Sequence, residues 1–170
     1  MITIRLESLD DASAVRRVNE VAFGQPLEAD LAERLQKSCA ESLSLVAVDE
    51  IVVGHILFTP VTVESEVRPV FGMGLAPMAV LPERQRQGLG SELVRHGIAL
   101  LRERGVPFVV VVGHPEYYPR FGFEPASAHG LRSQWDGMPD EAFMVLVLDG
   151  EAMAGVAGVA RYRPEFDDIS

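Results

Sequence analysis

The feature that most constrains this chain is a strand, turn and helix pattern over residues 75–96. An apolar run from Leu75 to Leu81 leads through a polar turn with Gly88 and Gly90 into a segment whose leucines recur at helical spacing. Glycine lets the chain bend tightly and lets a ligand approach the backbone, while the first N–H groups of a helix have no partner within it. The helix dipole adds partial positive charge at that end. The pattern therefore predicts an α/β protein with an anion-binding turn.

The residues of the turn distinguish between the known types of phosphate-binding motif. The sequence contains no G-x-x-x-x-G-K-[ST] motif, and Gly88-Leu-Gly90 lacks the third glycine of a dinucleotide fingerprint. The turn instead reads Gln85-x-x-Gly88-x-Gly90. This order resembles the acyl-CoA pyrophosphate loop of the GNAT superfamily of N-acetyltransferases, written [QR]-x-x-G-x-[GA].

A second segment supports the same resemblance. Residues 107–112 form a short apolar run rich in valine, which predicts a strand buried on both faces in the interior of a sheet. The run Tyr-Tyr-Pro-Arg-Phe-Gly-Phe at 117–123 follows and resembles the segment that closes the acetyl-CoA site in a small GNAT branch with the motif Y-Y-x-R-F-G-F, mostly of unassigned substrate. Aligned on Gly122 and Phe123, Tyr118 takes the family's tyrosine position. The link from the strand to the tyrosine is short and contains Pro115, so the helix that usually carries the tyrosine in this family is expected to be a single turn.

The resemblance implies acetyl-CoA as the acetyl donor and assigns residues to it. The backbone of the strand at Met78, Ala79 and Val80 would hold the pantetheine arm. The turn would hold the pyrophosphate through Gln85, Arg86, Gln87, Gly88, Leu89, Gly90 and Ser91. Tyr118 would serve the departing sulfur, and no metal is expected. The function so predicted is transfer of an acetyl group to a primary amine.

The general base is less well defined by the sequence. His114 is the first candidate because it follows the strand at 107–112, and Glu116 shares that position. His55, Glu64 and Glu66 stay open as alternatives. Water can also take the proton of an ammonium group, so a dedicated base is not required.

Hydrophobic spacing predicts the remaining elements of an α/β (α+β) fold. It predicts a mixed, mostly antiparallel sheet of six or seven strands with helices on both faces, in a single N-acetyltransferase-like domain over residues 1–170, as the resemblance also implies. Helices are expected from the cap at Asp10–Ser13 to Gly24, from Leu27 to Leu35, and after Gly90; strands are expected at 1–7, 44–49, 51–66, 73–81, 107–112 and 143–148, with a short edge strand near Tyr162.

Composition excludes several other classes of protein. The net charge of −10 argues against nucleic acid as a partner, because phosphate attraction needs a basic surface. No apolar run approaches about 18 residues, which predicts no membrane span, and the first residues lack the pattern of a signal peptide. The single cysteine, Cys39, predicts neither an internal disulfide nor a nucleophile. We expect a cytoplasmic enzyme whose acceptor is a small-molecule or peptide amine; a homodimer stays open.

Two other functions remain as alternatives. An acyl-CoA sensor or interaction module would keep the turn without catalysis, but Tyr118 favours transfer. A nucleotide-phosphate enzyme would need a phosphate-binding lysine, and the only lysine, Lys37, is far from the turn in the sequence.

Overall fold

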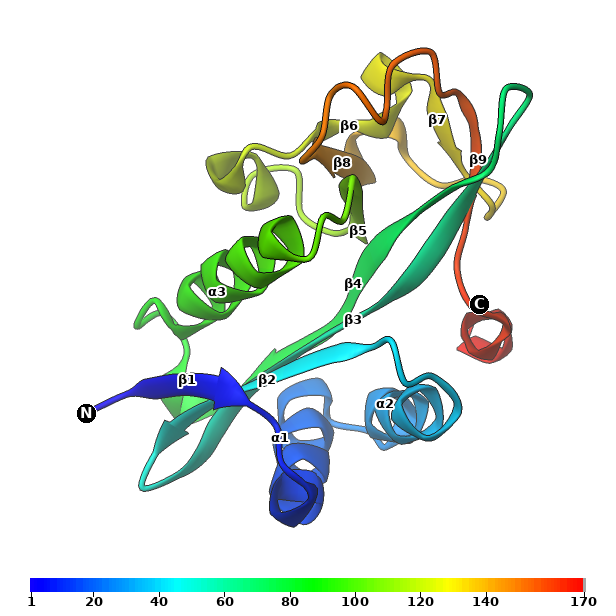
Figure 1. Ribbon diagram of the computed structural model, residues 1–170. Coiled ribbons are helices and arrows are strands. Elements are labelled where there is room, and N and C mark those ends of the chain that lie inside the picture. The colour runs from blue at the N-terminus through cyan, green and yellow to red at the C-terminus, as the bar shows by residue number, and fades with distance from the viewer. Residues whose placement is uncertain (170) are drawn as a thin grey trace. The chain divides into compact units, whose positions relative to one another are not determined.

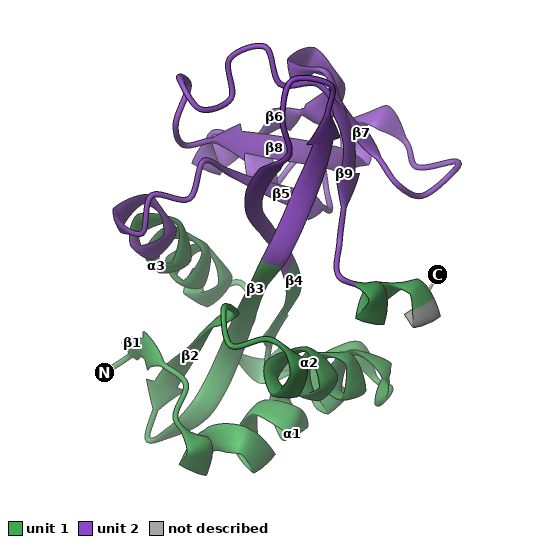
Figure 2. Cartoon of the chain, turned by 45° about the vertical axis from the view of Figure 1, so that its right-hand side comes forward, with its two compact units in different colours: residues 1–59, 76–99, 164–170 green, residues 60–75, 100–163 purple. Residues whose placement is uncertain are grey.

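The structure, a computed structural model, describes residues 1–169 and falls into two compact units (Figure 2). The first unit contains residues 1–59, 76–99 and the C-terminal segment from Pro164; the second contains residues 60–75 and 100–163. Three elements have part of their length in either unit: β3 (Ile51–Ser65), β4 (Val70–Val80) and α3 (Leu89–Glu103).

The first unit is built on an antiparallel sheet in which β2 (Leu43–Asp49) lies between β1 (Thr3–Leu6) and β3. The turn between β2 and β3 is a single residue, Glu50, with a left-handed φ of 65°. Two amphipathic helices follow β1: α1 (Ala12–Phe23), which ends at a left-handed Gly24, and α2 (Leu27–Ser38). These bounds agree with the helices and strands that the apolar spacing predicts.

Helices cover both faces of this sheet (Figure 1), and neighbouring residues of β3 show it. Successive side chains of a strand point to opposite faces. A Cβ at Gly54 would lie 3.2 Å from a methyl of Leu93 in α3. The ring of His55, one residue later, lies 3.1 Å from the amide of Asn19 in α1. The α3 side and the α1 side of the sheet are therefore distinct.

The second unit contains the buried strand that the valine run predicts. β5 (Phe108–Val112) pairs in parallel with β4 over Met73–Leu75 and antiparallel with β8 (Phe143–Val147). Phe108 to Val111 are at most 1% exposed. This strand, α3 and β4 form the βαβ unit expected from the sequence.

Three shorter strands complete the second unit. β6 (Glu124–Pro125) pairs with β8, and β9 (Gly158–Arg161) pairs with β3 on one side and with β7 (Leu131–Ser133) on the other. Short 3-10 helices connect many of the elements: η1 (Leu9–Asp11), η2 (Pro82–Arg84), η3 (Tyr118–Phe121), η4 (Ala126–His129) and η5 (Asp140–Ala142). A sixth 3-10 helix, η6 (Pro164–Ile169), follows β9 and belongs to the first unit.

The predicted fold class is confirmed, with two differences in detail. Residues 1–169 contain nine strands, whereas the sequence predicts six or seven. The strands β6 and β7, of two and three residues, escape prediction because they are too short to show a period in the sequence. The C-terminal strand was expected at an edge. It lies instead between β3 and β7. The sequence does not predict this position, because backbone pairing on the second side of a strand leaves no pattern in the spacing of its side chains.

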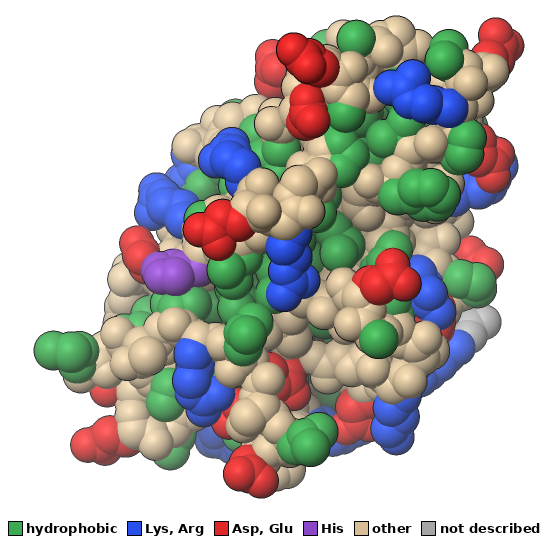
Figure 3. Space-filling view, viewed as in Figure 1, with side chains coloured by type: hydrophobic (Ala, Val, Ile, Leu, Met, Phe, Trp, Pro, Cys, Tyr) green, Lys and Arg blue, Asp and Glu red, His purple; other side chains and the backbone are tan. Residues whose placement is uncertain are grey.

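Charged side chains of both signs are interspersed on the face drawn in Figure 3. Red and blue side chains alternate there with apolar ones, so the net charge of −10 is not gathered into one acidic patch on that face. Among the described residues no helix is long and apolar enough to cross a membrane.

Candidate functional site

The polar turn after β4 leads into α3 through two residues with a left-handed backbone. Arg86 has a φ of 64° and Gly88 a φ of 83°, so the backbone is left-handed at two positions within three residues. Such a φ is costless for glycine and uncommon for arginine. A Cβ at Gly88 would meet nothing within 4 Å, so open space adjoins the backbone at this residue.

Side chains of the turn form hydrogen bonds that hold it to the rest of the first unit. The amide of Gln85 donates to the carbonyl of Val80 at 3.0 Å, which ties the turn to the end of β4. Arg84 donates to Gln87 at 3.2 Å and to Asp49 at 2.9 Å. The first position of the loop motif, Gln85, is therefore occupied in holding the loop's shape.

The N-terminus of α3 closes the turn. The N–H of Glu92 bonds back to the turn, at 3.0 Å from the carbonyl of Gly88. The N–H groups before it lie at the positive end of the helix dipole. Arg86 is exposed and, within residues 1–169, has no ion-pair or hydrogen-bond partner. A backbone rich in donors and a free guanidinium therefore lie within a few residues of one another, an arrangement suited to a phosphate.

The strand residues assigned to the pantetheine arm lie just before this turn. Met78 and Val80 are half-buried, and Ala79 is 3% exposed. They follow the stretch of β4 that pairs with β5, and all three belong to the first unit together with the loop.

The tyrosine segment belongs to the second unit and has a different character. Tyr118 is 7% exposed and begins the single turn η3, as Pro115 predicts. Its ring lies edge-on to those of Tyr117 and Phe123, with centroids 5.0 and 5.7 Å away. Burial, with a smaller contribution from Tyr117, raises the pKa of the Tyr118 hydroxyl to about 12. The phenol therefore stays protonated at every physiological pH.

The candidate bases differ in their access to solvent. His114 and Glu116, which precede Tyr118, are both exposed. His114 also anchors the tyrosine turn, because its carbonyl accepts hydrogen bonds from the N–H groups of Tyr117 (3.1 Å) and Tyr118 (3.4 Å). Its imidazole is therefore attached to the same turn as the tyrosine.

His55, by contrast, is part of a buried network. The side chain is 0% exposed; its Nε2 lies 2.8 Å from the hydroxyl of Ser44 and its Nδ1 lies 3.1 Å from the amide of Asn19. The Ser44 hydroxyl in turn donates to Glu7 at 2.5 Å. Burial alone would raise the pKa of Glu7, but hydrogen bonds from His55, Ser44 and Gln36 outweigh it and leave the pKa lowered. With both ring nitrogens engaged, His55 serves the core of the first unit and is not open to an amine.

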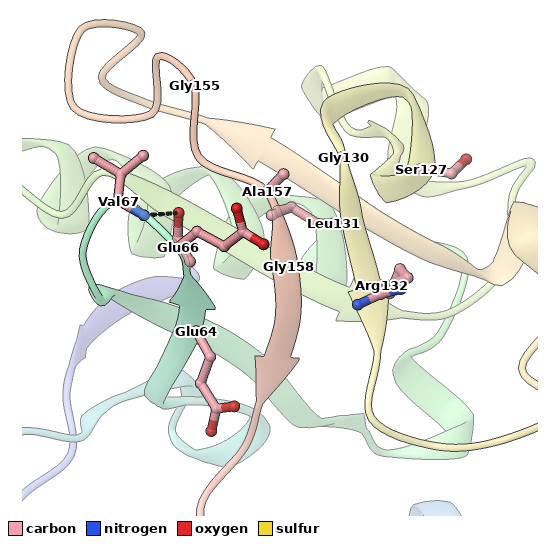
Figure 4. A pocket seen from close by; sticks show the side chains of 11 residues that line it. Glu64, Glu66, Val67, Ser127, Gly130, Leu131, Arg132, Gly155, Ala157 and Gly158 are labelled. Carbon is pink, nitrogen blue, oxygen red and sulfur yellow. Dashed lines mark hydrogen bonds between the residues drawn. The ribbon is translucent and has the colours of Figure 1, made fainter.

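The two remaining candidates, Glu64 and Glu66, line a cavity of about 590 Å³ in the second unit (Figure 4). The cavity adjoins the end of β3, β7 and the residues that lead into β9. Both glutamates are exposed, and Glu64 forms an ion pair with Arg161 at 2.9 Å. Glu64 is thus already partnered.

No group of histidine, cysteine and acidic side chains suited to a metal ion is found in residues 1–169. Cys39 is buried, and its N–H bonds to the carbonyl of Leu35 at the end of α2.

Known proteins share this fold. A family model described as the acetyltransferase (GNAT) domain matches residues 3–126. The chain belongs to the GNAT acetyltransferase family. It is accordingly an acyltransferase of the N-acetyltransferase kind.

Individual GNAT proteins resemble it over most of its length. The uncharacterized N-acetyltransferase YhbS of Escherichia coli K12 is 37% identical over 166 residues, 96% of this chain and 98% of the relative. The uncharacterized N-acetyltransferase YjhQ of the same strain is 45% identical over 128 residues, 74% of this chain and 71% of the relative.

Solved GNAT structures show the same fold with the acetyl carrier. The 1.55 Å crystal structure of E. coli YhbS in complex with CoA superposes with a TM-score of 0.90 at 36% identity and covers 98% of this chain and 92% of that chain. A GNAT acetyltransferase from Brucella melitensis in complex with acetyl-CoA has a TM-score of 0.78 at 32% identity, with coverage of 98% and 99%.

Two features of the candidate residues, one in each unit, are not evident from the sequence pattern. The bond from Gln85 to Val80 assigns a bracing role to a residue expected to touch the ligand. The second is Gly113, on which the ring of Tyr118 lies. A glycine directly after a run of four valines was the available signal for it, but glycine after a strand is common in any fold.

Proposed function

We propose that this GNAT protein transfers an acetyl group from acetyl-CoA directly to a primary amine. The observation that carries the proposal is the loop from Gln85 to Ser91, which combines two left-handed residues, the N-terminus of α3 and the unpartnered Arg86. Helix N-termini bind phosphate groups through backbone donors and the helix dipole. CoA carries a pyrophosphate, and the related YhbS structure contains CoA.

The residues present fit such a ligand. Open space at Gly88 leaves room for a phosphate beside the backbone, and the stretch from Met78 to Val80, half-buried at its two ends, offers strand amides to the pantetheine arm. We assign the pyrophosphate to backbone groups from Arg86 to Ser91 and to the Arg86 guanidinium, while Gln85 and Gln87 support the loop. Acetyl-CoA supplies the acetyl group in activated form, as a thioester.

We assign Tyr118 the proton for the departing sulfur. Its raised pKa keeps the hydroxyl protonated at neutral pH, so a proton is available whenever the carbon–sulfur bond breaks. A strongly basic phenolate would form if the proton left completely. The proton must therefore return from solvent after each turnover, or the hydroxyl acts by hydrogen bonding to the sulfur.

The amine must lose one proton before its nitrogen can form the new bond to the acetyl carbon. His114 is the side chain that we assign to this step, because it is exposed and its backbone closes the turn that carries Tyr118. Solvent water is the alternative acceptor of that proton. A variant His114→Gln that retains full activity at high pH would favour water.

The acceptor is proposed to be a small-molecule or peptide amine. The net charge of −10 suits a cationic substrate, although acidic surfaces also serve solubility. We further propose that residues 1–170 act as one N-acetyltransferase-like domain in the cytoplasm, as a monomer or a homodimer, with neither nucleic acid nor membrane as a partner.

The experiment is an acceptor screen in which thiol release from acetyl-CoA is followed with polyamines, aminoglycosides, amino acids and peptides with free N-termini. We expect thiol release to depend on one class of amine and mass spectrometry to find the acetylated product. Tight binding of acetyl-CoA without turnover on any amine would favour a non-catalytic acyl-CoA sensor instead.

A further inference from the structure

The ring of Tyr118 lies directly on the backbone of Gly113, five residues earlier. A Cβ placed on Gly113 would lie 2.3 Å from Cε2, 2.9 Å from Cδ2 and 3.4 Å from Cζ of the Tyr118 ring. Carbon atoms in contact are normally 3.5–4.0 Å apart. The ring therefore occupies the space that any side chain at position 113 would need.

The backbone at Gly113 cannot withdraw from the ring. Its N–H donates to the carbonyl of Ala142 at 2.9 Å. The residue before it, Val112, is paired with Phe143 in the ladder between β5 and β8. Position 113 is thus held by the central strand of the second unit.

The ring is confined on its other sides as well. The ring centroids of Tyr117, Phe123 and Phe121 lie 5.0, 5.7 and 6.3 Å from that of Tyr118. The N–H of Tyr118 bonds to the carbonyl of His114 at 3.4 Å, which folds the chain back toward Gly113. A side chain at position 113 must therefore push the ring, together with its hydroxyl, out of this seat.

We propose that Gly113 is a positioning residue for the transfer reaction: its missing side chain sets where the Tyr118 hydroxyl lies. The inference rests on the role proposed for that hydroxyl. Displacing a reacting group by about 1 Å can cost on the order of 10²-fold in rate. Gly113 touches neither acetyl-CoA nor the amine in this account and acts only through the tyrosine.

Other glycine and aromatic pairs in the molecule provide a matched control. A Cβ at Gly72 in β4 would lie 2.5 Å from the ring of Phe108, a fully buried side chain of the same unit with no assigned role in the reaction. Gly72→Ala therefore introduces a similar clash in a similar core. If close packing were all that Gly113 provides, the two alanine variants would behave alike.

The test compares Gly113→Ala with Gly72→Ala in the full-length chain. We expect both variants to melt at a lower temperature than the wild type. We expect only Gly113→Ala to lower kcat, by at least about tenfold, with the acetyl-CoA dissociation constant from calorimetry within about twofold of the wild type. Turnover can be followed as thiol release with the amine found in the screen or with water as the acceptor. An unchanged kcat in folded Gly113→Ala would overturn the inference.

A double-variant cycle separates position from packing. In the Tyr118→Phe background the clash with the ring remains but no hydroxyl is left to displace. Gly113→Ala should then lower the melting temperature as before and change kcat by less than about twofold. An equal loss of kcat in both backgrounds would mean that Gly113 only supports the fold.

A second variant keeps the test usable if Gly113→Ala folds poorly. Phe123→Leu removes the ring on another side of Tyr118 and gives the displaced tyrosine room to move. Gly113→Ala combined with Phe123→Leu should regain stability while kcat stays low. Recovery of kcat together with stability would overturn the proposal. Full activity of Tyr118→Phe alone would instead overturn the role of the tyrosine, so the two failures are distinguishable.

Discussion

The loop before α3 and the tyrosine segment after β5 differ in which part of the chain is proposed to meet the ligand: mainly backbone groups in the loop, and one buried side chain in the tyrosine segment. The loop, residues 85–88, is exposed, and the side chains of Gln85 and Gln87 hold its shape, so its proposed ligand contacts come mainly from backbone groups, with the Arg86 guanidinium as the one side chain. The tyrosine segment places one side chain, Tyr118, in a cluster of rings where it is 7% exposed. A site made of backbone depends on φ and ψ, whereas a site made of a buried side chain depends on packing. We therefore expect the loop to control binding and the segment to control the rate.

The largest expected effect lies in the tyrosine segment. Tyr118→Phe keeps the ring and its packing but removes the hydroxyl, so kcat should fall by about 10²-fold to 10⁴-fold if proton transfer limits the rate. The acetyl-CoA dissociation constant should be nearly unchanged. Steady-state kinetics and calorimetry on the same samples measure the two quantities.

The neighbouring tyrosine is the control for this experiment. Tyr117→Phe should change kcat little, because Tyr117 is not the residue aligned with the family's tyrosine. Loss of activity in Tyr117→Phe with normal turnover in Tyr118→Phe would shift the assignment by one residue.

The wild-type enzyme should also keep its activity up to about pH 10, because a pKa raised to about 12 leaves the Tyr118 hydroxyl protonated there.

The next effect concerns the whole ligand site. Acetyl-CoA at about 100 times its dissociation constant should stabilise the folded protein by roughly 2.7 kcal/mol, since only the folded state binds it. ATP and NAD at the same concentration should give no comparable shift of the melting temperature. A clear shift with ATP and none with acetyl-CoA would break the interpretation of the loop.

A smaller effect is expected from the loop backbone. Gly88→Val forces a branched side chain onto a φ of 83° and fills the open space beside the backbone, so acetyl-CoA should bind at least about tenfold more weakly, or roughly 1.4 kcal/mol. Gly24→Val is the matched control. Gly24 has a φ of 71°, and nothing lies within 4 Å of its Cβ position. It follows the last residue of α1 and is not part of the loop. Both should lose stability, but only the loop variant should lose affinity. Equal affinities would make the Gly88 turn purely structural.

The smallest effect is expected from the exposed arginine. Arg86→Ala removes one solvent-screened charge near the proposed phosphate and should weaken acetyl-CoA binding by roughly two- to fivefold, about 0.5–1 kcal/mol. The difference should shrink as NaCl is raised, because salt screens exposed charges. Arg17→Ala, an exposed arginine on α1, should leave the affinity unchanged. A larger loss that salt does not reduce would mean that the Arg86 side chain, and not only the backbone, builds the site.

Sequence patterns alone determined a large part of this protein. The leucine spacing around Gly90 predicts α3, the valine run predicts the buried β5, and the two motifs predict membership of the GNAT family. These signals are local, because helical and strand periods and glycine turns depend on residues close together in the chain. The residues assigned to acetyl-CoA and catalysis rest on the same motifs and stay predictions.

Tertiary structure decided what local patterns cannot carry. The burial of His55 between Asn19 and Ser44 removed it from the candidate bases, although its sequence context resembles that of any strand histidine. The seat of Tyr118 on Gly113 likewise depends on a turn that folds one residue back onto another. Such contacts depend on where separate segments meet, and the physical terms that fix them, burial and steric exclusion, act only once the chain is folded.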